Sequence, residues 1–176
     1  MRALFELFLA ICLLRKGPQD VPASPVLLRL TLLSYGLSGV LIQLQLLDVD
    51  LASSLVLTVL NIVLLTGFAY SVLVWRHYPQ RFMQTLTALL GTGTLLRLLA
   101  LLLLLMDQET TPADTSGWFR LLWQGPFVWS IFVMAHILRH AGSTSLAMGV
   151  VYTLIYLFLS SMTISWIASS GLQPVS

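Results

Sequence analysis

Residues 82–106 form a 25-residue apolar segment that holds a single charge, Arg97, deep inside it. As an α-helix this segment would be roughly 37 Å long, whereas the hydrocarbon core of a bilayer is about 30 Å thick. The length therefore predicts a membrane-spanning helix with some tilt. A charge near the centre of a span costs roughly 2.5–3.5 kcal/mol on insertion scales, so such a residue usually faces a protein interior or water. Arg97 is accordingly the first candidate functional residue.

The composition extends this prediction to the whole chain. Hydrophobic residues make up 57% and charged residues 9% of the 176 residues, and the mean hydropathy is +0.90. Soluble domains carry roughly 25% charged residues, so this chain has too few to cover a surface in water. We predict an all-α integral membrane protein with a single transmembrane domain over residues 1–176. The basic residues form no patch of the size that nucleic-acid binding requires, so no nucleic-acid partner is expected.

Five apolar stretches are long enough to cross a bilayer. The expected spans are residues 26–47, 51–75, 82–106, 118–139 and 145–169. Short turns join the first span to the second, the second to the third and the fourth to the fifth, so these neighbours should be antiparallel. The longest loop, residues 107–117, is polar and acidic. Pro126 lies inside the fourth span and should kink it, because proline leaves a backbone carbonyl of the preceding turn without a donor.

The N-terminal residues 2–15 predict a sixth helix that does not span. Its apolar run, residues 3–14, is too short to cross a bilayer, and Arg15 and Lys16 follow it directly. No small-residue cleavage site of a signal peptide follows it either. We expect this helix to lie in the cytoplasmic interface of the membrane, or to be tucked under the bundle.

Basic residues decide the orientation, because Lys and Arg accumulate in cytoplasmic loops. Arg97 lies within the membrane, and only Arg120 lies on the side opposite the N-terminus. The seven basic residues on the N-terminal side are Arg2, Arg15, Lys16, Arg29, Arg76, Arg81 and Arg139. This distribution predicts a multi-pass protein of the plasma membrane, in bacteria the inner membrane, with its N-terminus in the cytoplasm and its C-terminus outside.

Each expected span offers a polar residue at a similar depth. Arg97 lies nine residues from the outer end of its span and Asn61 lies ten residues from the outer end of the second span. The same count reaches three serines, Ser38, Ser130 and Ser160. This intramembrane polar layer could be a cavity or a site for an anionic headgroup. Alternatively, Arg97 extends toward the outer polar residues Gln43, Gln45, Asp48 or Asp50, and the serines align by chance.

Small residues mark the faces along which helices should pack closely. Gly36 and Gly39 mark such a face on the first span, and Thr87, Gly91 and Thr94 mark one on the third. These positions predict helix–helix contacts.

Catalytic, metal and cofactor sites are not expected. Cys12 is the only cysteine, so neither a disulfide nor a cysteine-based metal site can form within the chain. His136 and His140 have the spacing of a metal pair on a helix, but no third ligand is near them in sequence. The seven carboxylates include no pair within a span that could act in acid–base catalysis. We predict a protein that is not an enzyme and needs no cofactor.

The layout resembles a known family. The N-terminal helix, the break at residues 15–20, the five spans and above all the stretch RFMQTLTALLGTG, residues 81–93, resemble small bacterial membrane proteins related to the Yip-type domain family. The acidic-Leu-Tyr-Gly-Pro signature of the eukaryotic members is absent, so their role in vesicle traffic is not implied. The resemblance implies a five-helix, non-enzymatic integral membrane protein.

Two functions fit these features. The first is an interaction or scaffold subunit in the lipid bilayer, which forms a homo-oligomer or binds another membrane protein. The alternative is a small transporter or channel for an anionic or lipidic substrate, with Arg97 as the residue that binds it.

Overall fold

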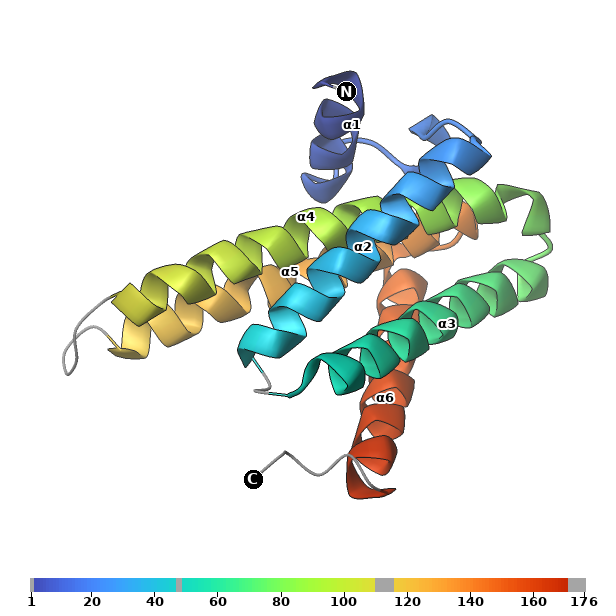
Figure 1. Ribbon diagram of the computed structural model, residues 1–176. Coiled ribbons are helices and arrows are strands. Elements are labelled where there is room, and N and C mark those ends of the chain that lie inside the picture. The colour runs from blue at the N-terminus through green and yellow to red at the C-terminus, as the bar shows by residue number, and fades with distance from the viewer. Residues whose placement is uncertain (1, 47–48, 110–115, 171–176) are drawn as a thin grey trace.

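The computed structural model describes the backbone of residues 2–46, 49–109 and 116–170, and the side chains of residues 3–45, 49–106 and 124–165. Its regular secondary structure in these ranges is helical throughout, which confirms the all-α prediction (Figure 1). The bounds lie within three residues of those expected from the sequence. The helices are α1 (Arg2–Cys12), α2 (Pro25–Leu46), α3 (Leu51–Trp75), α4 (Phe82–Glu109), α5 (Ser116–Ala141) and α6 (Leu146–Ser170), with short 3₁₀ helices η1 (Pro18–Asp20) and η2 (Pro79–Arg81).

Four helical segments of the described chain are long and apolar enough to cross a membrane. They are Pro25–Gln45, Leu51–Trp75, Pro79–Met106 and Leu146–Ser165. These four are compatible with a multi-pass membrane protein. Helix α5, which contains the fourth expected span, is not among them, and the side chains of its first residues lie outside the described part. The fifth span therefore stays a prediction. The acidic loop at 107–117, Asp48 and Arg120 also lie outside the described side chains.

Helix α3 begins at a polar cap. The Asp50 carboxylate accepts hydrogen bonds from the backbone amides of Ala52 at 3.0 Å and Ser53 at 3.3 Å. These bonds satisfy two of the amides that a helix N-terminus leaves without an intrahelical partner. Asp50 is thereby used at the end of the helix, although the sequence allowed it as a partner for Arg97.

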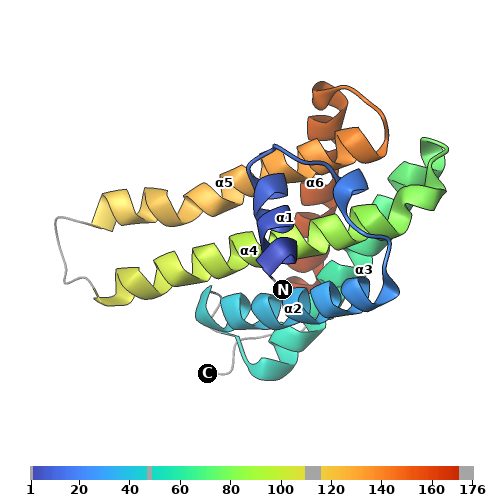
Figure 2. The ribbon, with the colours of Figure 1, turned by 90° about the horizontal axis from the view of Figure 1, so that it is seen from above.

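Helix α4 is the centre of the bundle. It contacts α1, α2, α3 and α5, and every residue from 85 to 92 is buried. Helix α5 runs beside α4, and α2 crosses α4 obliquely (Figures 1 and 2). Helix α6 packs on α5 and runs across the other long helices (Figure 1). Because α4 carries Arg97, this arrangement surrounds the charged residue with other helices.

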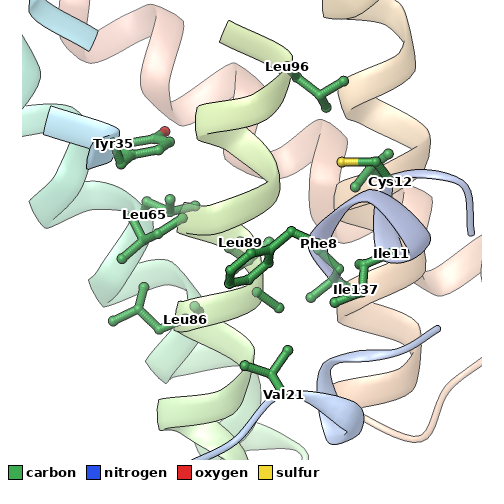
Figure 3. Packing of buried hydrophobic residues seen from close by; sticks show 14 of the residues in the cluster. Phe8, Ile11, Cys12, Val21, Tyr35, Leu65, Leu86, Leu89, Leu96 and Ile137 are labelled. Atoms are coloured by element: carbon green, nitrogen blue, oxygen red, sulfur yellow. The ribbon is translucent and has the colours of Figure 1, made fainter. Parts of the chain in front are cut away.

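Helix α1 packs on the side of α4 and α5. It lies across the two helices in Figure 2, and its Phe8, Ile11 and Cys12 point into the core in Figure 3. The Phe8 ring lies directly on Gly91, where an added Cβ would overlap the ring atoms. Gly91 is nine residues after Phe82, or about 14 Å along α4. Helix α1 is thus packed beside the middle of α4. The alternative expectation from the sequence, a position under the end of the bundle, does not match this packing. Its placement in a membrane interface stays a prediction.

Two arginines close the end of the bundle that was expected to face the cytoplasm. Arg81 Nη1 donates to the carbonyls of His140 at 3.3 Å and Ala141 at 3.2 Å, and Arg76 Nε donates to the carbonyl of Gly142 at 3.3 Å. Carbonyls at a helix C-terminus lack intrahelical donors and are favourably placed for cations. The turn between α3 and α4 is thereby tied to the turn between α5 and α6.

The two histidines considered as a metal pair lie at the same end. Their rings are 4.5 Å apart, and His136 Nε2 lies 3.0 Å from the carbonyl of Lys16. No group of three or more metal-ligating side chains occurs in the part of the chain that the structure describes. His136 therefore connects α5 to the segment that follows α1.

Candidate functional site

A cavity of about 630 Å³ lies between α2, α3, α4, α5 and α6. Small-molecule sites typically enclose roughly 300–1,000 Å³, so the volume is that of a ligand site. Most of the lining consists of apolar side chains. The polar lining residues are Tyr35, Asn61, Thr92, Arg97, Gln124, Ser130, Thr153, Tyr156 and Ser160. The described helices therefore line a partly open apolar space with a few polar groups and one charge.

The guanidinium of Arg97 is held by residues of α2 and α3. Its Nη1 donates to the backbone carbonyl of Tyr35 at 3.2 Å, and its Nη2 donates to the Tyr35 hydroxyl at 2.8 Å and to Asn61 Oδ1 at 3.0 Å. The guanidinium carbon also lies 3.7 Å from the centre of the Tyr35 ring. This distance is short enough for a cation–π interaction. Arg97 is thus oriented by its neighbours and does not extend toward Gln43 or Gln45.

Two glycines make room for this arrangement. A Cβ on Gly93 would lie 2.7 Å from Cε2 of Tyr35, and a Cβ on Gly39 would lie 2.8 Å from Nη1 of Arg97. Real Cβ atoms do not approach other atoms so closely, so a side chain at either position would displace the tyrosine or the arginine. Gly39 was expected to serve helix packing. It does lie where α2 approaches Thr58 of α3, and it also gives Arg97 the space that its guanidinium occupies.

Asn61 connects Arg97 to α6. Its Oδ1 accepts hydrogen bonds from Arg97 and from the Tyr35 hydroxyl at 2.9 Å, and its Nδ2 donates to the Tyr156 hydroxyl at 3.0 Å. Tyr156 is 7% exposed and Tyr35 is 6% exposed, so both rings are buried in the bundle. One network of hydrogen bonds therefore joins α2, α3, α4 and α6 at the cavity wall.

The structure brings most of the expected polar layer to this cavity. Arg97, Asn61, Ser130 and Ser160 all line it. Ser38 is buried next to it, and its hydroxyl donates at 3.1 Å to the same Tyr35 carbonyl that accepts from Arg97. Counting residues from the ends of the spans thus identified groups that lie close together in space.

The charge of Arg97 has no anionic partner among the described side chains. Its three hydrogen-bond acceptors are a carbonyl, a hydroxyl and a carboxamide, all of them neutral. An arginine carries its charge at any physiological pH, and a buried charge is costly unless an opposite charge or several hydrogen bonds stabilise it. Among the described residues, the groups that stabilise the positive charge at the cavity wall are therefore all neutral.

Two tyrosines of the site, Tyr35 and Tyr156, were not among the residues selected from the sequence. A signal for both does exist, because tyrosines in spans are usually found near the membrane surfaces, whereas these two lie in the middle of their helices. The tyrosine side chain is also longer than one helical turn. The depth of its Cα atom in the membrane therefore does not give the depth of its hydroxyl.

The remaining packing positions have the following surroundings. A Cβ added at Gly36 would lie 3.8 Å from Cδ1 of Ile62 on α3, which is ordinary contact. The Thr87 side chain is fully buried, and Thr94 is 9% exposed. Both threonine hydroxyls donate to backbone carbonyls of their own helix, four residues earlier. Helix α5 continues through Pro126, which lines the cavity. A kink at Pro126 stays a prediction.

Helix α1 covers the seam between α4 and α5 next to the cavity. The Cys12 thiol lies 3.9 Å from the backbone oxygen of Thr92, a lining residue, and Trp129 Nε1 donates to the Cys12 carbonyl at 2.9 Å. Together with Phe8 on Gly91, these contacts hold the end of α1 on both helices.

Cys12 gives a way to measure this docking. Burial raises the pKa of its thiol to about 11, and alkylating reagents react with the thiolate. At pH 8 we expect iodoacetamide to modify Cys12 on the order of a hundredfold more slowly than a free thiol, whose pKa is about 8.5, with the rate rising up to about pH 11. Gly91→Val should displace Phe8 and raise the rate at pH 8. An exposed cysteine, Gln80→Cys in a Cys12→Ala background, is the control, and equal rates for the two sites would contradict the docking.

No protein-family model, curated protein or solved structure matches the chain. The resemblance to the Yip-type domain family therefore stays a prediction, and the functional interpretation depends on the cavity itself.

Proposed function

We propose that this protein is an integral membrane protein that binds an anionic or lipidic small molecule in the cavity between its long helices and transports it. The observation that carries the proposal is the charge of Arg97, which faces a cavity of about 630 Å³ and has only neutral partners among the described residues. A bound anion would supply the missing opposite charge, and the apolar lining would contact the rest of the ligand. No catalytic group is needed for this role.

The proposed setting is the plasma membrane, in bacteria the inner membrane. Helix α5 would be the fifth span, with the N-terminus in the cytoplasm and the C-terminus outside, as the distribution of basic residues indicates. Large apolar side chains on the outer faces of the helices agree with contact with lipid. Examples are Leu33 at 71%, Val63 at 60% and Phe158 at 60% exposure. In water, such surfaces would be expected to aggregate.

The test is ligand binding by the purified protein in nanodiscs of zwitterionic lipid. Thermal unfolding should shift upward with decanoate, because a ligand that binds only the folded state stabilises it by about 2.7 kcal/mol at a hundred times its Kd. Decanol and decyltrimethylammonium have the same chain with no charge or the opposite charge, and they should have much smaller effects. Uptake of the anion into proteoliposomes then tests transport. Equal stabilisation by all three amphiphiles would contradict a role for Arg97.

A second candidate, an interaction or scaffold subunit, is favoured by small residues on the outer face of α3. Gly67 is exposed, and a Cβ there would meet nothing within 4 Å. Ser71, one turn later, is also exposed, and its hydroxyl donates to the Gly67 carbonyl at 2.8 Å. Two small residues at this spacing allow a second helix to approach closely. The mass of the protein in mild detergent should then be that of an oligomer, and Gly67→Leu should reduce it. A monomeric wild-type protein would argue against this candidate.

A further inference from the structure

The hydrogen bonds around Arg97 all run in one direction. A guanidinium has only donors, so the Asn61 side-chain atom that faces Arg97 Nη2 at 3.0 Å must be the oxygen. The amide nitrogen of Asn61 therefore faces Tyr156 and donates to its hydroxyl at 3.0 Å. Tyr35 accepts from Arg97 and uses its own hydrogen for Asn61. The order of donation is thus Arg97 to Tyr35, Tyr35 to Asn61, and Asn61 to Tyr156.

This order leaves a hydrogen-bond donor at the cavity wall. Because the Tyr156 oxygen accepts from Asn61, its own hydrogen points elsewhere. Ser160, one turn further along α6, interacts with the Tyr156 hydroxyl and lines the same cavity. Whichever of these two hydroxyls donates to the other, one hydrogen remains for a ligand. A chain of hydrogen bonds that starts at a cation polarises each following donor, so the last hydroxyl is a good partner for an anion.

Arg97 itself also has donors to spare. A guanidinium carries five N–H groups, and three of them are used by Tyr35 and Asn61. Arg97, Tyr156 and Ser160 all line the cavity, and the described residues accept from no further N–H group of Arg97. The carboxamide of Asn61 lies between Arg97 and Tyr156.

We infer that the cavity binds a single-chain amphiphile with one negative charge, whose anionic group lies between Arg97 and the hydroxyls of Tyr156 and Ser160. This inference rests on the proposed function and names its ligand. Arg97 is the only charged residue among those that line the cavity in the described chain, so one negative charge balances it. A second negative charge would be buried without a partner. A carboxylate or another singly charged group fits this count, and a doubly charged phosphate monoester does not.

The volume of the cavity limits the apolar part of the ligand. At roughly 30 Å³ for each small heavy group, the share that water has in the liquid, the cavity of about 630 Å³ holds about twenty non-hydrogen atoms. A fatty acid of about eighteen carbons has this size and a shorter one such as decanoate also fits, whereas a membrane phospholipid with two chains is much larger. The apolar lining includes Leu89, Leu96 and Leu157, which suit an alkyl chain.

The test is competition against a fluorescent fatty acid in nanodiscs of zwitterionic lipid at pH 8, where an alkyl phosphate, with a second pKa of about 6, carries two charges. Decanoate should displace the probe at a concentration at least tenfold lower than decyl phosphate or phosphatidylglycerol. Tighter binding of decyl phosphate would overturn the single charge, and tighter binding of phosphatidylglycerol would overturn the single chain. Either result would leave the proposed function in place. If no anion is preferred over decanol, the proposed function itself fails.

Tyr156→Phe tests the position of the anion. It removes the hydroxyl and keeps the buried ring, so we expect decanoate to bind about tenfold more weakly, as is typical when a hydrogen bond to a charged group is lost, while decanol binding is unchanged. Tyr152→Phe is the matched control. Tyr152 is buried on the same helix, its hydroxyl has no hydrogen-bond partner among the described residues, and it does not line the cavity. Unchanged decanoate affinity in both Tyr156→Phe and Ser160→Ala would overturn the assignment of these hydroxyls.

Discussion

Gly149→Ala is expected to destabilise the protein by about 1–3 kcal/mol, the usual cost of adding a methyl group where no space exists. Gly149 is buried at the start of α6, and an added Cβ would overlap the backbone oxygen of Ala135 on α5. A backbone atom cannot rotate away as the end of a side chain can, so the two helices must separate. Alanine favours the helix over glycine by up to about 1 kcal/mol, which is too little to offset the overlap. The measurement is thermal unfolding in mild detergent.

Gly67→Ala is the matched control for this prediction. Gly67 is also in the interior of a long helix, but a Cβ there meets nothing within 4 Å. Only the gain in helix propensity remains, so its unfolding temperature should stay the same or rise slightly. If Gly149→Ala behaved like Gly67→Ala, the close contact between α5 and α6 would be wrong.

The positions of the helices could be predicted from the sequence because each is a long apolar stretch between polar turns. Helix α3, residues 51–75, was predicted with the bounds that it has, since Asp50 and Pro79 mark its two sides. For α5 the same reasoning is weaker, because Gly125 and Pro126 interrupt its apolar run. The angles at which the helices cross depend on contacts between residues that are distant in sequence. The hydrophobic periodicity of a single helix carries no information on those contacts.

Helix α1 illustrates this limit. Its apolar residues extend beyond the buried side, with Phe8 and Ile11 buried, and with Phe5 at 55% and Leu9 at 43% exposure. Arg2 and Glu6, four residues apart, share the other face and suit a membrane surface, so periodicity alone does not decide where the helix lies. Its position is decided by the fit of the Phe8 ring to Gly91, and Gly91 is more than eighty positions away in the sequence. Small residues on α4 indicated that some helix would pack there, but not which one.

The candidate site was only partly predictable for a related reason. Counting residues from the ends of the spans placed Asn61, Ser130 and Ser160 near Arg97, because depth along a helix follows from its rise per residue. The count contains no information on direction around the helix or on the reach of a side chain. It therefore missed Tyr35, whose carbonyl, ring and hydroxyl all contact Arg97.

Arg97→Leu is expected to remove the preference for anions without unfolding the protein. Two of the three acceptors that lose Arg97 keep another donor: the Tyr35 carbonyl keeps Ser38 at 3.1 Å, and Asn61 Oδ1 keeps the Tyr35 hydroxyl at 2.9 Å. The third acceptor, the Tyr35 hydroxyl, keeps its own donation to Asn61. Because the substitution also removes a half-buried charge that has no anionic partner among the described side chains, the unfolding temperature should be unchanged or higher. Decanoate should bind roughly tenfold to a hundredfold more weakly, the usual effect of losing hydrogen bonds to a charged group.

Two further substitutions at Arg97 separate its charge from its shape. Arg97→Lys keeps the charge but cannot reach Tyr35 and Asn61 together with a planar fork, so decanoate affinity should fall between those of the wild type and Arg97→Leu. Arg97→Glu places a carboxylate next to the Tyr35 carbonyl and Asn61 Oδ1, which are both acceptors. It should lower the unfolding temperature and abolish anion binding. Equal stability and equal decanoate affinity in the Leu, Lys and Glu variants would mean that the side chain at this position faces lipid, and the cavity would then have no charged residue with which to recognise an anion.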